Sequence, residues 1–333
     1  RGLVYALQTR NWLSERGEGW IEIPTVIVRD WPSFLIRGVV EGFYGDPWER
    51  EDRGLILRHM RAFKMNSYLY APKQDPYHRE EWREPYPHSI MAKLREFFML
   101  ARRSYVEPIF GLSPGLSVEY SSREDEIRIV KKLIEVSRAG VKWFALLFDD
   151  IPEELRGRDR EKYSSLAGAQ ADLVNRVYRR LRSLIPGARV IVCPTEYAGT
   201  EMSSYFNELC SKLSREIAIM WTGPEVCSRS IELSQAEKLR KVASREVVIW
   251  DNYPVNDYAR NRPNLGPLRG RDPRLWRKVA GILSNPMNEA RASLAPLATA
   301  ADYMWNPEGY DPDSSWSHAL ELLYGDLSGD VGQ

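Results

Sequence analysis

A regular alternation of short apolar runs with longer amphipathic segments constrains the fold of this chain more than any other feature. Eight apolar runs, each about as long as a β-strand, occupy residues 35–40, 67–71, 105–111, 143–148, 189–193, 217–221, 247–250 and 279–283. The segments between them have the three- and four-residue apolar spacing of helices, as at Ile127, Val130 and Leu133. Helices are predicted at residues 50–63, 89–103, 123–139, 166–184, 201–213 and 234–243.

Strands that alternate with helices require right-handed crossover connections and a parallel sheet. Eight such strands in about 250 residues is the expected size of a (β/α)₈ barrel. We therefore predict a TIM barrel. A doubly wound open sheet is the alternative fold, but the chain lacks the Gly-rich turn with which many such sheets bind dinucleotides.

The chain divides into three expected parts. Residues 1–30 lie outside the repeat, with a helix at 2–16 and a strand at 20–29, and we expect them to be the truncated end of a preceding small α/β domain. Residues 31–305 are predicted to form the barrel. Residues 306–333 are a tail or the start of a C-terminal helical region, with a helix around 317–323. Because the chain begins at Arg1, we expect a fragment or mature form, and the sequence gives no localisation.

Composition excludes several classes of function. Lys and Arg number 47 against 46 Asp and Glu, so the chain has no overall field to attract nucleic acid or an anionic membrane. The three cysteines form no disulfide framework, and neither they nor the four histidines have metal-ligand spacing, so no metal is predicted. No apolar run approaches the roughly 18 residues of a membrane span. Oligomeric state is not indicated.

Two adjacent carboxylates, Asp149 and Asp150, follow the apolar run at 141–148. Like charges a few ångströms apart resist ionising together, so one carboxyl of such a pair tends to keep its proton. A protonated acid beside a carboxylate suits glycoside cleavage. A helix N-cap or a calcium ligand is the alternative interpretation of the pair. Because successive strand side chains point to opposite faces, both acids can face one pocket only if the chain leaves the strand at Asp149. Ile151-Pro152 fits such a break.

Polar and aromatic residues collect where the predicted strands end, which is where TIM barrels build their active sites. Carboxylates, amides and aromatic rings occur together at residues 41–48, 71–76, 149–150, 193–197, 221–223, 250–257 and 284–286. Amides and acids bond sugar hydroxyls, while Trp and Tyr rings cover the apolar face of a pyranose. With few cations and no Gly-rich phosphate turn, this lining indicates a neutral sugar.

Several of these segments closely resemble glycoside hydrolase family 84, which comprises bacterial β-N-acetylglucosaminidases and animal protein O-GlcNAcases. The segments are residues 37–48, 65–76, 148–151, 193–197, 221–224 and 250–252, together with Asp257 and 285–286. The likeness extends in order from residue 34 to 297, and residues 2–24 resemble the end of the α/β domain that precedes the barrel in bacterial members. The resemblance implies a retaining exo-β-N-acetylglucosaminidase without a cofactor. Its implied substrates are β-GlcNAc-bearing glycans or glycoproteins, with O-GlcNAc on proteins among them.

The same resemblance implies substrate-assisted catalysis, in which the 2-acetamido oxygen of the sugar attacks the anomeric carbon and forms an oxazoline. Asp149 would orient the acetamido N–H and stabilise the oxazoline, while Asp150 would act as general acid and then general base. Substrate contacts are implied for Gly42, Lys73, Tyr197, Trp250, Asn252, Asp257 and Asn285. Cys193 matches a pocket residue of the family, although a small buried hydrophobe is an equal interpretation.

Within this set, Tyr197 and Asn252 match the residues that hold the acetamido group. Asp257 and Asn285 match those that bond the distant hydroxyls, and Lys73 matches a lysine that bonds a ring hydroxyl. Gly42 would bring its backbone close to the sugar and Trp250 would form a wall of the pocket, while Tyr44 and Asp75 are expected to be structural supports.

Two other classes of function remain as alternatives. One is a catalytically silent glycan-binding module, although such a module gains little from two repelling acids. The other is a conventional retaining glycosidase with a nucleophile of its own, which would also accept glucosides that lack the acetamido group.

Overall fold

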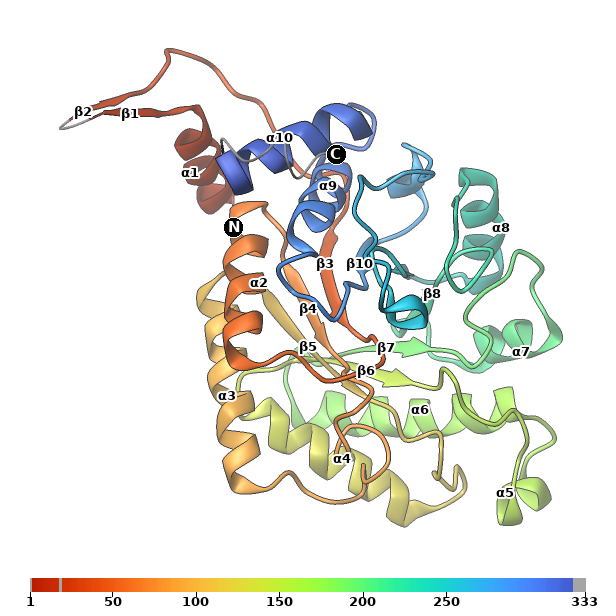
Figure 1. Cartoon of the computed structure of the whole chain (residues 1–333). Helices are drawn as coiled ribbons and strands as arrows, with labels where there is room; N and C mark the ends of the chain where they lie inside the picture. Colours follow the sequence, from red (N-terminus) through yellow and green to blue (C-terminus); the bar gives the residue numbers. More distant parts are fainter. Residues whose placement is uncertain (1, 18–19, 326–333) are drawn as a thin grey trace.

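The computed structural model describes residues 2–17 and 20–325, in which eight parallel strands close into a barrel (Figure 1). Consecutive strands are hydrogen-bonded neighbours, and β10 pairs with β3 to complete the ring. The strands are β3 (Ile36–Glu41), β4 (Ser67–Tyr70), β5 (Glu107–Leu112), β6 (Trp143–Leu147), β7 (Arg189–Cys193), β8 (Ala218–Trp221), β9 (Val247–Asp251) and β10 (Gly281–Ser284). The predicted TIM barrel is therefore confirmed, and every predicted apolar run overlaps one of its strands.

Helices surround the barrel, and those predicted between the strands are confirmed within a few residues. The helices are α2 (Arg50–Ala62), α3 (His88–Arg103), α4 (Arg123–Ser137), α5 (Gly157–Lys162), α6 (Leu166–Leu184), α7 (Ser204–Lys212), α8 (Leu233–Ala243), α9 (Leu294–Trp305) and α10 (Pro312–Tyr324). Helix α7 begins later than predicted because the Ser203 hydroxyl caps it, accepting from the Phe206 N–H. The short α5, the helix α9 and the 3₁₀ helices η1 (Asp257–Ala259) and η2 (Leu275–Arg277) were not predicted, and α10 begins five residues before the predicted helix around 317–323.

The strand side chains alternate between two apolar clusters. One set, including Val40, Leu69 and Met220, packs with its counterparts from other strands inside the barrel. The alternate set, including Tyr68 and Phe144, packs against the helices in a larger cluster. Burial on both faces explains why the strands are continuous apolar runs rather than alternating ones.

The segment before the barrel differs from the prediction. Helix α1 (Gly2–Leu13) ends three residues early, because β1 (Glu15–Gly17) pairs antiparallel with β2 (Trp20–Glu22). The expected strand at 20–29 stops at Glu22, and the hairpin projects away from the barrel (Figure 1). Residues 1 and 18–19 of the first expected part, and residues 326–333 of the third, lie outside the described residues.

Helix α1 is fixed to the N-terminal end of the barrel by polar contacts. The Tyr5 hydroxyl accepts a hydrogen bond from Arg37 Nη2 at 2.8 Å, and its ring packs edge-on against Trp305. Lys64 Nζ donates to the Thr9 hydroxyl at 2.7 Å. Within the described part of the chain, no helix has the combination of length and apolar character needed to cross a membrane.

Barrel closure depends on glycines in β3 and in β10, the two strands that meet at the β3–β10 seam and complete the ring. A Cβ atom on Gly38 would lie 1.7 Å from the Ser67 carbonyl oxygen of β4. A Cβ atom on Gly281 would lie 2.1 Å from the Ile36 carbonyl oxygen of β3. Because these neighbours are backbone atoms in paired strands, they cannot move aside without breaking the ladder on either side of β3.

We expect Gly38→Ala to destabilise the protein by about 3 kcal/mol or more, because the added methyl group separates β3 from β4. Gly54→Ala is the matched control, since a Cβ there meets only Arg58 Nη1 at 3.5 Å. In the interior of α2 this control should stabilise by about 0.5–1 kcal/mol. Differential scanning calorimetry of both variants tests the pair, and equal melting temperatures would contradict the argument.

Candidate active site

A cavity of about 400 Å³ opens at the C-terminal end of the barrel, within the usual size range of small-molecule sites. The structure brings together all the residues predicted for the site, and each of them lines this cavity: Gly42, Lys73, Asp149, Asp150, Cys193, Tyr197, Trp250, Asn252, Asp257 and Asn285. Cys193 and Trp250 lie at the ends of β7 and β9, and the others come from the loops after β3, β4, β6, β7, β9 and β10. Six further residues complete the lining, namely Tyr44, Thr222, Val226, Cys227, Val255 and Tyr258.

Asp149 is a buried carboxylate in which one oxygen forms an ion pair and the other accepts no hydrogen bond. Its Oδ2 forms an ion pair with Lys73 Nζ, and both side chains are almost inaccessible to solvent. Among the described residues, no donor reaches Asp149 Oδ1, which is also buried. Burial alone would raise the pKa of Asp149, but the Lys73 ammonium beside it and the Arg79 guanidinium hold that pKa below its ordinary value. Asp149 is therefore ionised, with an acceptor free for an N–H donor.

Asp150 lies in the opposite environment, exposed at the pocket mouth. The hydroxyl of Tyr44 donates to Oδ2 at 2.7 Å, and the hydroxyl of Tyr197 donates to Oδ1 at 2.8 Å. Burial and the Asp150 carboxylate raise the pKa of both tyrosines, so both hydroxyls keep their protons. The two neighbouring acids are thus separated in environment although they are adjacent in sequence.

The backbone departs from the strand where the sequence requires it. Strand β6 ends at Leu147, one further sheet-like bond joins Phe148 N–H to the Cys193 carbonyl at 2.9 Å, and Asp149 and Asp150 form a turn. Asp150 has a φ of 51°, in the left-handed region. This conformation lets both acids line one cavity, which a regular strand would prevent.

Gly42 and Trp250 form one wall of the cavity. A Cβ atom on Gly42 would lie 2.3 Å from Cζ2 of the Trp250 indole, so the glycine is needed to admit the ring. The Lys73 ammonium lies 5.7 Å from the centroid of that ring and 5.6 Å from that of Tyr44. An aromatic wall therefore lies beside the Lys73–Asp149 ion pair.

Two side-chain amides are held in fixed orientations by a chain of hydrogen bonds. Asn252 Oδ1 accepts from Trp250 Nε1 at 3.0 Å and from Asn285 Nδ2 at 2.9 Å. Asn252 Nδ2 donates to the Val226 carbonyl at 2.7 Å, and Asn285 Oδ1 accepts from the Gly42 N–H at 3.3 Å. Each amide therefore presents known donor and acceptor edges to the cavity.

The remaining two predicted residues differ in character. Asp257 lies in η1 and accepts from the Tyr44 N–H at 2.8 Å, which ties the loop after β9 to the loop after β3. Cys193 is buried, and burial followed by the nearby Asp149 charge raises the pKa of its thiol. The Cys193 side chain is accordingly a neutral, small pocket residue.

The sequence that builds this site matches a known protein family. The family model for β-N-acetylglucosaminidase matches residues 37–331, nearly the whole chain. The chain belongs to the β-N-acetylglucosaminidase family. The rat and mouse proteins named protein O-GlcNAcase are each 38% identical over 283 residues, which is 83% of this chain but 31% of theirs.

Solved structures of this family superpose closely. A variant of the Thermobaculum terrenum O-GlcNAc hydrolase has a TM-score of 0.88 and 40% identity over 90% of this chain and 65% of its own. The protein CpGH84B has a TM-score of 0.91 and 35% identity over 99% of this chain and 58% of its own. The resemblance to glycoside hydrolase family 84 is thereby confirmed. The chain spans about a third of the curated relatives and less than two thirds of these two solved chains.

Tyr44 corrects one expectation from the sequence. It was expected to be mainly a structural support, yet it also lines the cavity and donates to Asp150. Asp75 does act as a support, accepting from the hydroxyls of Tyr70 and Tyr86 at 2.8 and 2.7 Å. Within residues 2–17 and 20–325, no group of three or more His, Cys, Asp or Glu side chains is arranged to hold a metal ion.

We expect Lys73→Met to raise the pKa of Asp149, because the variant removes the ammonium that opposes the effect of burial. Carboxyl ¹³C chemical shifts of aspartate-labelled protein, titrated with pH, measure this change, and Asp149→Asn identifies the resonance. Arg83→Met removes a cation from the same loop without touching Asp149 and is the control. An Asp149 pKa that is unchanged or lower in Lys73→Met would refute the assignment.

Proposed function

We propose that this protein is a retaining exo-β-N-acetylglucosaminidase that hydrolyses terminal β-linked GlcNAc by substrate-assisted catalysis. The observation that carries the proposal is the state of Asp149, a buried carboxylate with one oxygen on Lys73 and one without a donor. An acetamido N–H would satisfy that vacant oxygen. Family membership and the 35–40% identity to O-GlcNAc hydrolase and CpGH84B over most of the chain support the same activity.

In the first step the acetamido oxygen forms a bond to the anomeric carbon while the glycosidic C–O bond breaks. The leaving oxygen takes a proton from Asp150, and the oxazoline that forms carries positive charge beside the Asp149 carboxylate. In the second step water gives a proton to Asp150 and attacks the anomeric carbon, which reopens the oxazoline. The anomeric configuration is inverted twice and therefore retained. The scheme uses no cofactor.

The burial of Asp149 favours this scheme over a conventional nucleophile. A nucleophilic carboxylate must direct an oxygen at the anomeric carbon, but Oδ2 is paired with Lys73 and the side chain is 8% exposed. A fixed, buried charge is better suited to stabilising positive charge that develops on the substrate.

The other pocket residues are proposed to bind the sugar. Tyr197 and Asn252, which both line the cavity, hold the acetamido group. Asp257 and Asn285 bond the distant hydroxyls and so determine which hexosamine fits. Trp250 covers an apolar face of the ring.

The remaining assignments concern Lys73, Gly42 and Cys193. Lys73 bonds a ring hydroxyl as well as Asp149, since an ammonium has three donors. Gly42 gives the sugar and the Trp250 indole room beside its backbone. Cys193 contributes a small neutral surface to the cavity.

The natural substrate is proposed to be a glycan or glycoprotein bearing β-GlcNAc, with O-GlcNAc on proteins included because the curated relatives carry the name protein O-GlcNAcase. Residues 31–305 are proposed as the catalytic barrel, residues 1–30 as the end of a preceding α/β domain, and residues 306–333 as a tail or the start of a helical region.

Aryl glycosides with successive fluorination of the N-acyl group test substrate participation. We expect kcat/KM to fall with each added fluorine, because fluorine withdraws electron density from the attacking acyl oxygen. A series that is flat, or equally rapid cleavage of the matching glucoside, would show that the enzyme supplies its own nucleophile.

Substitution of the acids separates their roles. Asp150→Asn should lower kcat/KM by roughly 10²–10⁴-fold for a poor leaving group such as methoxyphenol. It should have much less effect on a dinitrophenyl glycoside, whose leaving group departs without a proton. Asp149→Asn should slow both substrates alike, because oxazoline formation accompanies the departure of either leaving group. Sugar binding by the wild type without hydrolysis of either substrate would instead indicate a glycan-binding module.

A further inference from the structure

The backbone of Asp150 needs an explanation beyond its own side-chain contacts. Its φ of 51° lies in the left-handed region, which L-residues avoid, although Asp tolerates it better than most. Residues held there persist only where their surroundings fix them. Tyr44 and Tyr197 hold the carboxylate, but neither contacts the Asp150 backbone by any hydrogen bond that the structure gives.

A buried arginine from another loop contacts that backbone directly. Arg79 lies in the loop after β4 and is 6% exposed. Its Nη2 donates to the Asp150 carbonyl oxygen at 3.0 Å. This bond engages the peptide that follows the left-handed residue, so it opposes rotation of the turn back toward an extended conformation.

Arg79 is itself fixed to the barrel. Its Nη1 donates to the hydroxyl of Ser113, at the end of β5, at 3.3 Å. The Ser113 N–H donates to the His78 carbonyl at 2.9 Å, and the His78 ring bonds the Gly111 carbonyl at 2.9 Å. One side chain therefore joins the ends of three successive strands, β4, β5 and β6.

We propose that Arg79 is a positioning residue that holds Asp150 in its left-handed turn and so keeps the acid aligned with the glycosidic oxygen. This inference rests on the proposed function. The two tyrosine bonds must rearrange when a carboxylate oxygen of Asp150 gives up or takes a proton. The Arg79 bond to the carbonyl does not depend on that proton, so it holds the turn through both steps.

The leaving-group dependence of the rate distinguishes this role from general support. In Arg79→Met, we expect kcat for the methoxyphenyl glycoside to fall roughly 10- to 100-fold, as for loss of one charge-assisted hydrogen bond. KM should be unchanged, because Arg79 does not line the cavity. The kcat/KM of the dinitrophenyl glycoside, which reports only the first step, should stay near the wild-type value, and Arg79→Lys should recover part of the loss.

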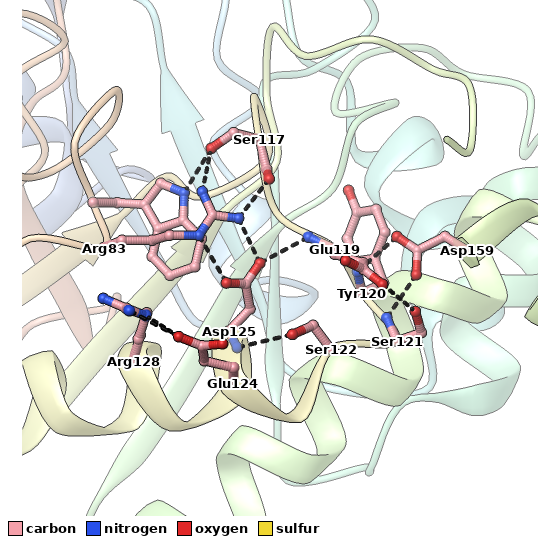
Figure 2. A network of polar contacts seen from close by, with 11 residues as sticks. Arg83, Ser117, Glu119, Tyr120, Ser121, Ser122, Glu124, Asp125, Arg128 and Asp159 are labelled. Carbon is pink, nitrogen blue, oxygen red and sulfur yellow. Dashed lines mark hydrogen bonds and ion pairs between the residues drawn. The ribbon is translucent and has the colours of Figure 1, made fainter. Parts of the chain in front are cut away.

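Arg83→Met is the matched control. Figure 2 shows Arg83, from the same loop, bonded to Ser117 and Asp125 in a network that does not include Asp149 or Asp150. Like Arg79 it is a cation that joins this loop to the residues after β5, with Arg83 Nη2 donating to the Ser117 carbonyl at 2.6 Å. Its loss should lower the melting temperature and leave the ratio of the two rates unchanged.

Each outcome decides the inference. If Arg79→Met slows both substrates equally, or raises KM alone, Arg79 is only a structural support and the inference is wrong. Asp150→Asn, measured in parallel, tests the proposed function separately. If the wild type hydrolyses neither substrate, the proposed function fails, and a crystal structure of Arg79→Met then decides the inference. Retention of the left-handed Asp150 in that structure would overturn it, and a relaxed turn would support it.

Discussion

Closure of the parallel sheet at the β3–β10 seam is the constraint on which the rest of the molecule depends. Each strand end is placed by hydrogen bonds to its two neighbours, and the ring fixes all of them relative to one another. Residues separated by more than 200 positions, such as Gly42 and Asn285, are joined across the seam. The pocket is rigid because these loops start from a closed ladder, and such rigidity is what preorganised catalysis requires.

At the end of β6 two adjacent carboxyl groups, which would repel each other if both were charged, lie in different surroundings. Asp149 is buried against a cation, whereas Asp150 is exposed and held by neutral hydroxyls. Their separation arises from one turn of backbone at the end of β6. Environments that differ this strongly allow two identical groups to take different chemical roles.

The sequence predicted the strands, most of the helices and ten of the sixteen residues that line the cavity, because these follow from periodicity and from motifs at strand ends. It did not predict partners that are distant along the chain. The Lys73–Asp149 and Tyr44–Asp150 contacts join residues 76 and 106 positions apart, and they depend on side-chain conformations that no local pattern encodes. The hairpin at 15–22 was missed because its strands are only three residues long.

The loop after β3 has a consequence for how the pocket would respond to its ligand. The Tyr44 hydroxyl bonds Asp150, while the backbone N–H of the same residue bonds Asp257. Two positions earlier, the Gly42 N–H bonds Asn285. The short segment 42–44 therefore contacts both kinds of group. Asp257 and Asn285 are proposed to bond the sugar hydroxyls, and Asp150 is proposed to transfer the proton. If the proposed function holds, substitutions that alter sugar selectivity and substitutions that alter proton transfer should have non-additive effects. A substitution that changes the preference for one hexosamine hydroxyl should also change the proton-transfer step.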